Sequence, residues 1–217
     1  MDSIFNLDNK FFQSVGKLVD MICLSLLWLL LCIPVVTAGA ATTAMYYTVN
    51  KVIRHNRGYL LKDFFASFKS NFKQSTIVWL ILLVVYALMG VDFYIMFEYA
   101  KAGEQYGALY IVVIVLIAFV TMWAMYLFPY MARFANTTRN VIKNALLIAI
   151  ANLWKTILMF VLFLGTVVII YKCPGAIVLA PAFFTLIQNL FLEKIFRKYM
   201  SPEDLAAEDE RNREYMN

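Results

Sequence analysis

The sequence has few of the side chains from which enzyme and metal sites are usually built. It is 217 residues long and contains one histidine, His55, and three cysteines, Cys23, Cys32 and Cys173. The cysteines lack metal-ligand spacing, and two of them lie in an apolar run, where a free thiol behaves as a small hydrophobic group. With one histidine in a polar turn, metalloprotease and Ser-His motifs lack parts, and no glycine-rich phosphate loop occurs. We therefore expect no enzyme activity, no metal site and no cofactor.

Charged residues are scarce as well, at 15% of the chain against about 25% in soluble domains. Hydrophobic residues make up 63% and the mean hydropathy is +0.72, which excludes a water-soluble globule, a secreted disulfide scaffold, a disordered tail and a coiled coil. The formal net charge of +5 comes from basic residues that lie between apolar runs. We therefore expect these basic residues to lie beside the lipid bilayer, and we expect no nucleic-acid partner.

Five apolar runs are candidates for membrane-crossing helices, which need about 20 residues. They cover residues 18–36, 77–97, 108–132, 156–171 and 176–196. The last two are separated by a short segment containing Pro174-Gly175, which predicts a tight antiparallel hairpin. Segment 37–53 is more polar, and it is either a short helix packed through its small residues or an interfacial elbow. Five spans are predicted, and a sixth stays open.

Lysine and arginine are unevenly distributed between the runs. Residues 50–75 contain six and residues 133–155 contain four, whereas the segments after the second and fourth runs contain only Lys101 and Lys172. The positive-inside rule then places 50–75, 133–155 and the C-terminus in the cytoplasm. The N-terminus is inside with six spans and outside with five.

Three segments repeat apolar residues at steps of three and four without being apolar all round: 4–18, 61–73 and the less polar 141–152. A basic face opposite phenylalanine and leucine is typical of a helix lying in the headgroup plane. The favoured interpretation of segment 61–73 is therefore membrane anchoring. The alternative is a surface for docking a partner or lipid, with these candidate residues: Phe64, Phe68, Lys69, Phe72 and Lys73.

Two polar side chains are candidates for a role inside the membrane. Asp92 lies about 24 Å along its predicted helix, which favours a hydrated position near the outer boundary. Asn152 is of a type that forms hydrogen bonds between membrane helices. The sequence shows no buried pair of opposite charges near the middle of the membrane, so an ion-coupled transporter is not favoured.

The composition changes after residue 200, which divides a membrane domain (1–200) from a polar tail (201–217). Ser201 is a favourable N-cap, Pro202 suits the first helical position, and two acidic residues follow. The sequence predicts a solvated, frayed helix in a cytoplasmic tail.

Four segments carry a resemblance to a known family. They read LLWLLLCIPVVTAGAATTAMYYTV at 26–49, DFFASFKSNFKQST at 63–76, YLFPYMARFANTTRNVIKNALLIAIANLWKT at 126–156, and KYMSPED near the end. Together they resemble the YesL-like family, bacterial integral membrane proteins whose domain has no assigned function. The family often has Gly-Pro where this chain has Gly39-Ala40. The resemblance implies genes near carbohydrate ABC importers and sensor kinases of Gram-positive bacteria, and it supplies no catalytic or binding residues.

These observations predict an all-α polytopic transmembrane helix bundle of the bacterial plasma membrane, with amphipathic interfacial helices on its cytoplasmic side. The first functional hypothesis is a non-catalytic accessory protein that assembles with the permease of a carbohydrate ABC importer or with its sensor kinase. The alternatives are an autonomous small-solute transporter of sugar type and a lipid-organising structural protein. The partner, the substrate and the oligomeric state stay open.

Overall fold

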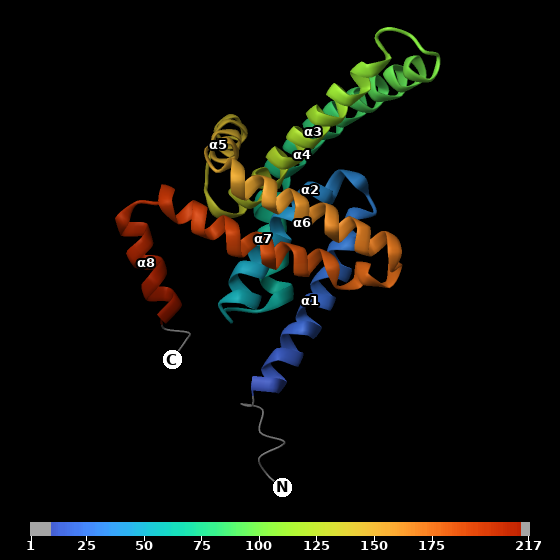
Figure 1. The fold of residues 1–217 in the computed structure, drawn as a ribbon. Helices are drawn as coiled ribbons and strands as arrows, with labels where there is room; N and C mark the ends of the chain where they lie inside the picture. The colour runs from blue at the N-terminus through green and yellow to red at the C-terminus, as the bar shows by residue number, and fades with distance from the viewer. Residues whose placement is uncertain (1–9, 214–217) are drawn as a thin grey trace.

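The computed structural model describes residues 10–213, and it describes side chains from Ser14 onward. Within that range the chain forms helices and no strands, which confirms the predicted all-α class (Figure 1). The α-helices are α1 (Lys10–Cys32), α2 (Ala38–Thr48), α3 (Leu60–Lys101), α4 (Tyr110–Arg133), α5 (Thr138–Ala151), α6 (Leu153–Lys172), α7 (Ala180–Phe196) and α8 (Pro202–Arg213). Short helical turns join them: η1 (Val35–Thr37), η2 (Val49–Arg54), η3 (Gly107–Leu109), η4 (Pro174–Val178) and η5 (Arg197–Tyr199).

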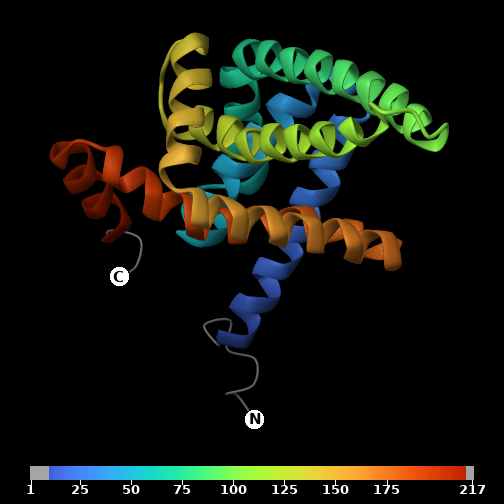
Figure 2. The same ribbon diagram turned by 45° about the horizontal axis from the view of Figure 1, so that its top comes forward.

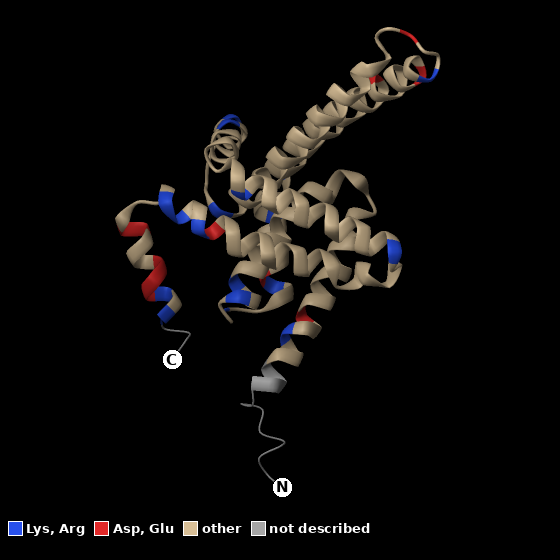
Figure 3. Cartoon of the chain, in the orientation of Figure 1, with Lys and Arg blue, Asp and Glu red and all other residues tan. Residues whose placement is uncertain are grey.

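Two antiparallel hairpins dominate the arrangement. Helices α3 and α4 form an arm that extends beyond the body, and α6 and α7 form the second hairpin through η4, as the Pro-Gly turn predicts. The tips of both hairpins point the same way, and α5 and α8 lie at the opposite end (Figure 2). We call this opposite end the basic end, because lysine and arginine gather there around α5, η2 and the end of α7 (Figure 3).

Four helical segments are long and apolar enough to cross a membrane, and they correspond to four of the five predicted runs. They are Ser14–Cys32, Leu60–Lys101, Gly107–Arg133 and Leu153–Lys172. The fifth predicted run is divided between η4 and the 17-residue α7, which buries Gln188, Asn189 and Glu193. These helices support an integral membrane protein, and the total number of spans stays a prediction.

Helix α2 is the first of the two alternatives left open for segment 37–53, a short packed helix rather than an interfacial elbow. It has 11 residues, too few to cross a bilayer, and most are buried against α1, α3, α4 and α7. A Cβ atom on Gly39 would lie 2.6 Å from both the Ser75 carbonyl oxygen and the Trp79 Cβ. The Thr43 and Ser75 hydroxyls are hydrogen-bonded at 2.9 Å. Glycine therefore permits the backbones of α2 and α3 to approach closely.

Segment 61–73 is not a separate interfacial helix, because it forms the first turns of α3. This helix has 42 residues and a length of about 63 Å, roughly twice the hydrocarbon thickness of a bilayer. No proline interrupts residues 60–101, so the amphipathic segment continues directly into the apolar one. Segment 141–152 does lie in a helix of its own, α5. The amphipathic segment 4–18 lies partly outside the described residues, and its described part belongs to α1.

Polar side chains join α7 to two earlier helices at points where backbone groups lack helical partners. Pro129 inside α4 has no N–H to bond the Met125 carbonyl four residues earlier. The Gln188 side chain donates to that carbonyl at 2.7 Å. At the start of α7 the Ala182 N–H donates to the Ser25 hydroxyl of α1 at 3.1 Å. These bonds fix α7 against the bundle through groups that would otherwise be unsatisfied.

Candidate functional site

A buried acidic side chain, Glu193 of α7, is the centre of a polar network at the basic end. Its side chain is 3% exposed. One carboxylate oxygen accepts hydrogen bonds from the Tyr46 hydroxyl at 3.1 Å and the Asn50 amide at 3.2 Å. The other lies 3.2 Å from Arg133 Nε, although the angle makes this an ion pair rather than an aligned hydrogen bond. One carboxylate thus connects α2, η2, the end of α4 and α7.

Helix α8 is anchored to this network. Arg133 forms an ion pair with Glu208 of α8, and Arg197 binds both carboxylate oxygens of Asp209 at 2.8 and 2.9 Å. Ser201 accepts a hydrogen bond from the Asp204 N–H at 3.1 Å, so the predicted helix start is confirmed. The frayed, solvated state expected for this helix differs from the structure, because Glu208 is buried against the bundle.

The sequence prediction did not single out Glu193 or Arg133 as site residues. Glu193 is the only acidic residue in run 176–196, and that single carboxylate was the available signal. Asn189, one helical turn earlier, accepts a hydrogen bond from Arg54 at 3.0 Å. Spacing of four residues places both on one helix face, so the pair predicts a polar stripe without revealing its partners.

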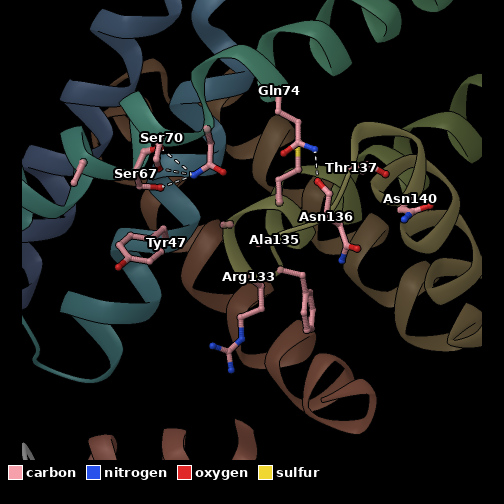
Figure 4. Close-up of a pocket in the computed structure, with 14 residues that line it drawn as sticks. Tyr47, Ser67, Ser70, Gln74, Arg133, Ala135, Asn136, Thr137 and Asn140 are labelled. Atoms are coloured by element: carbon pink, nitrogen blue, oxygen red, sulfur yellow. Dashed lines mark hydrogen bonds between the residues drawn. The ribbon is translucent and has the colours of Figure 1, made fainter. Parts of the chain in front are cut away.

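An open groove of about 950 Å³ lies between α3, the end of α4 and the start of α5. Its polar lining is mainly uncharged and consists of Tyr47, Ser67, Ser70, Asn71, Gln74, Asn136, Thr137 and Asn140, with Arg133 as the charged member. Gln74 reaches across it and donates to the Asn136 carbonyl at 2.7 Å (Figure 4). We call this the polar groove. Its hydroxyls and amides both donate and accept, which suits neutral polar groups such as peptide amides or alcohols.

A second cavity, of about 510 Å³, lies beside the groove and shares Tyr47, Ala132 and Arg133 with it. We call it the basic cavity. Its remaining lining residues are Tyr46, Asn50, Lys51, Arg57, Gly58, Glu208 and Arg211. Lys51 pairs with Asp63 at 2.7 Å, and Asp63 also accepts from the Tyr59 N–H at the start of α3. Gly58 adopts φ +79°, and a Cβ there would lie 2.0 Å from the Asp63 carboxylate.

The candidate docking residues of segment 61–73 differ in accessibility. Phe64 is fully buried in a cluster with α1 and α2 residues, and Phe68 is partly buried against the same cluster. Lys69, Phe72 and Lys73 are exposed. Phe64 therefore supports the fold, whereas the last three are accessible to lipid or to a partner.

The two candidate intramembrane polar residues lie outside the network. Asp92 is exposed on the distal part of the α3–α4 arm. Asn152 joins α5 to α6, and its side chain donates to the Ile148 carbonyl at 3.0 Å, a bond to the preceding turn rather than to a distant helix. Within the described chain, no three His, Cys, Asp or Glu side chains form a metal-binding group.

Residues 21–93 match a family model whose description is protein of unknown function, DUF624. That domain is the YesL-like family of bacterial membrane proteins. The predicted resemblance is confirmed. The matched part is shorter than the resemblance suggested, since it ends within α3. No curated protein and no solved structure matches the chain.

The DUF624 segment supplies one side of each cavity. Tyr46, Asn50 and Arg57 lie within it, as do the α3 residues of the polar groove. Arg133 and Glu193 lie beyond it. Both cavities therefore form where the matched segment meets the second half of the chain.

His55 of the DUF624 segment provides a titration test of this packing. Burial, reinforced by Arg54 and Arg57, lowers the pKa of the imidazole to about 4 from a usual value of about 6.5. Between these pH values the unfolded chain binds a proton that the folded chain does not. Stability is therefore expected to fall as the pH drops from about 6.5 towards 4, with no further loss from this group below that.

The measurement is ¹H–¹⁵N NMR of histidine-labelled protein in detergent, where one imidazole gives one titration curve. Arg57→Gln should raise the pKa of His55, because a neighbouring positive charge disfavours protonation. A midpoint near pH 6.5 in the unmodified protein would contradict the half-buried placement.

Proposed function

We propose that this integral membrane protein is a non-catalytic accessory protein that docks a partner through the exposed side of segment 61–73. The observation that carries the proposal is the length of α3, because a helix of about 63 Å extends well beyond a hydrocarbon core of about 30 Å. Its first turns keep Phe65 and Phe72 39% and 40% exposed beside the exposed Lys69 and Lys73. Exposed aromatic rings are enriched at protein interfaces, and the lysines beside them would guide the approach of an acidic partner.

The polar groove supports the same proposal. Ser67, Ser70, Asn71 and Gln74 line it from a neighbouring side of the same α3 segment. A partner lying on Phe72 and Lys73 therefore finds uncharged donors and acceptors next to them, suited to a peptide backbone.

The partner we propose is the permease of a carbohydrate ABC importer or its sensor kinase. The resemblance to the YesL-like family supports this choice through the gene neighbourhood that it implies. The basic end is proposed to be cytoplasmic, with the C-terminus on that side, since lysine and arginine gather there (Figure 3).

The test is cross-linking in native membranes, with sugars present and absent, from a photoreactive residue in place of the exposed Phe72. A permease or sensor kinase should be enriched over unrelated membrane proteins. Lys69→Glu combined with Lys73→Glu should reduce its recovery at least tenfold, because like charges facing each other across an interface cost several kcal/mol and about 1.4 kcal/mol is already tenfold. Lys143→Glu, an equally exposed site on α5, is the matched control. Recovery unchanged by the double reversal would exclude segment 61–73 as the docking surface.

The second candidate is an autonomous small-solute transporter, and the uncharged lining of the polar groove favours it. A cavity deeper in the bundle, about 390 Å³, is largely apolar and includes Phe128, Phe163 and Phe184, so it offers a sugar few partners. Liposomes containing only this protein should then show solute flux that Gln74→Ala, which changes the lining of the polar groove, reduces strongly. The absence of flux over a broad sugar panel would exclude this candidate.

A further inference from the structure

The basic cavity contains more positive than negative charge. Four cationic side chains and one carboxylate line it: Lys51, Arg57, Arg133, Arg211 and Glu208. Lys51 is neutralised by Asp63, and Arg133 by Glu193 and Glu208. Among the side chains that the structure describes, residues 14–213, no ion pair joins Arg57 or Arg211 to a carboxylate. Two cations, one from the turn before α3 and one from α8, are therefore available to an anion.

Three buried polar atoms in the same lining lack hydrogen-bond partners within the described chain, and one of them, Arg133 Nε, has an ion-pair contact with Glu193 instead. The other two are Arg57 Nε, a donor, and Asn50 Oδ1, an acceptor. Buried polar groups in native proteins are almost always hydrogen-bonded, so an unsatisfied donor and acceptor beside a cavity indicate an absent partner. That partner must accept a bond from a guanidinium group and donate one to an amide oxygen.

We propose that the basic cavity binds a phosphate ester that also carries a free hydroxyl group. The phosphate oxygens accept from Arg57 and Arg211, in the charge-assisted geometry for which guanidinium groups are suited. The hydroxyl donates to Asn50. The volume of about 510 Å³ lies within the range of small-molecule sites. This site is independent of which partner protein the docking surface binds.

Glu208 occupies one arginine of the cavity and so competes with the ligand. Its carboxylate contacts Arg133, and it projects from α8 three residues before Arg211, on the same side of the helix. A phosphate group repels Glu208 and attracts Arg211. Removing the charge of Glu208 should therefore strengthen binding, whereas removing that of Arg211 should weaken it.

A phosphate ester with a free hydroxyl group occurs both among soluble molecules and in lipid headgroups. A lipid source is reasonable because anionic headgroups are expected at the basic end. Two arms of one experiment distinguish these sources. In the first, the full-length protein in an uncharged detergent is titrated with glycerol 3-phosphate by calorimetry. In the second, nanodiscs of phosphatidylcholine with and without phosphatidylglycerol are compared by the amount of each lipid retained after extraction.

Saturable binding is expected in at least one arm. Arg57→Gln and Arg211→Gln should each weaken it about tenfold, as expected for the loss of a charged hydrogen bond, and Glu208→Gln should strengthen it about threefold. Glycerol lacks the anion and sulfate lacks the hydroxyl, so each should bind at least tenfold more weakly than glycerol 3-phosphate. Lys143→Gln removes an exposed charge that lines neither cavity and should change nothing.

Specific retention of phosphatidylglycerol would identify a lipid source, and binding of glycerol 3-phosphate alone would identify a soluble one. Binding in neither arm would overturn the proposal, as would equal losses from Arg57→Gln and Lys143→Gln. Arg211 is exposed on α8, so Arg211→Gln keeps the test valid if Arg57→Gln fails to fold.

Discussion

Replacing Glu193 with leucine is expected to lower the free energy of unfolding by about 3 kcal/mol. Removing one member of a buried ion pair costs about 3–5 kcal/mol, because the remaining charge stays buried without compensation. Arg133 keeps Glu208 as a second partner, which places the expected loss at the lower end of that range. The hydroxyl of Tyr46 and the amide of Asn50 also lose their acceptor. The measurement is reversible unfolding in mixed micelles.

A double-mutant cycle separates the ion pair from the other contacts of Glu193. Arg133→Met combined with Glu193→Leu should be less destabilising than the sum of the two single changes, because neither charge is then left without the other. Glu98→Leu is the matched control, since Glu98 forms an exposed pair with Lys101 at the tip of the arm, worth about 0–1 kcal/mol. Equal losses for Glu193→Leu and Glu98→Leu would show that the network does not stabilise the fold.

Replacing Gly39 with leucine is expected to separate α2 from α3, with a loss of about 3 kcal/mol in the free energy of unfolding, the upper end of the usual cost of overpacking a tight contact. Even a Cβ atom would lie 2.6 Å from a backbone oxygen of Ser75, and a backbone atom cannot move aside as a flexible side chain can. The same unfolding measurement applies. The hydrogen bond between Thr43 and Ser75 would break at the same time.

Gly90 provides a matched control for Gly39. It also lies in a helix, but a Cβ atom there would meet nothing within 4 Å. Gly90→Leu should therefore be tolerated or slightly stabilising, since leucine has the higher helix propensity. Similar losses at the two positions would contradict the close approach of α2 and α3.

The apolar runs predicted the helices that are long enough to cross a membrane, because each needs only local hydrophobicity to be recognised. The small residues around Gly39 favoured a packed helix through the compositional signal of close approach, but they left an interfacial elbow equally open until the structure was known. The continuity of α3 was missed for a related reason. An amphipathic pattern followed by an apolar one was interpreted as two elements, although no helix-breaking residue lies between them.

Local sequence patterns could not predict the polar network. Tyr46 bonds Glu193 across 147 residues of sequence, and Arg133 bonds Glu208 across 75. No spacing rule relates such positions, because the distance between them is set by how α2, α4, α7 and α8 pack. The burial of Phe64 also depends on tertiary packing and could not be predicted from local pattern. Its place on an amphipathic stripe gave no indication that it is buried against α1 and α2, while Phe72 two turns later is exposed.

The position of α7 near the end of the chain has a consequence for biosynthesis. Gln188 supplies the hydrogen bond that Pro129 denies to Met125, and Ala182 bonds Ser25 across 157 residues. Both earlier groups lie in helices that leave the ribosome well before α7 does. During synthesis the Met125 carbonyl needs a temporary partner in water, lipid headgroups or the insertion machinery, because an unsatisfied backbone group in hydrocarbon is costly, while the Ser25 hydroxyl does not yet have its final donor. Helices α1 and α4 thus reach their final hydrogen bonding only after the last apolar helix has been made.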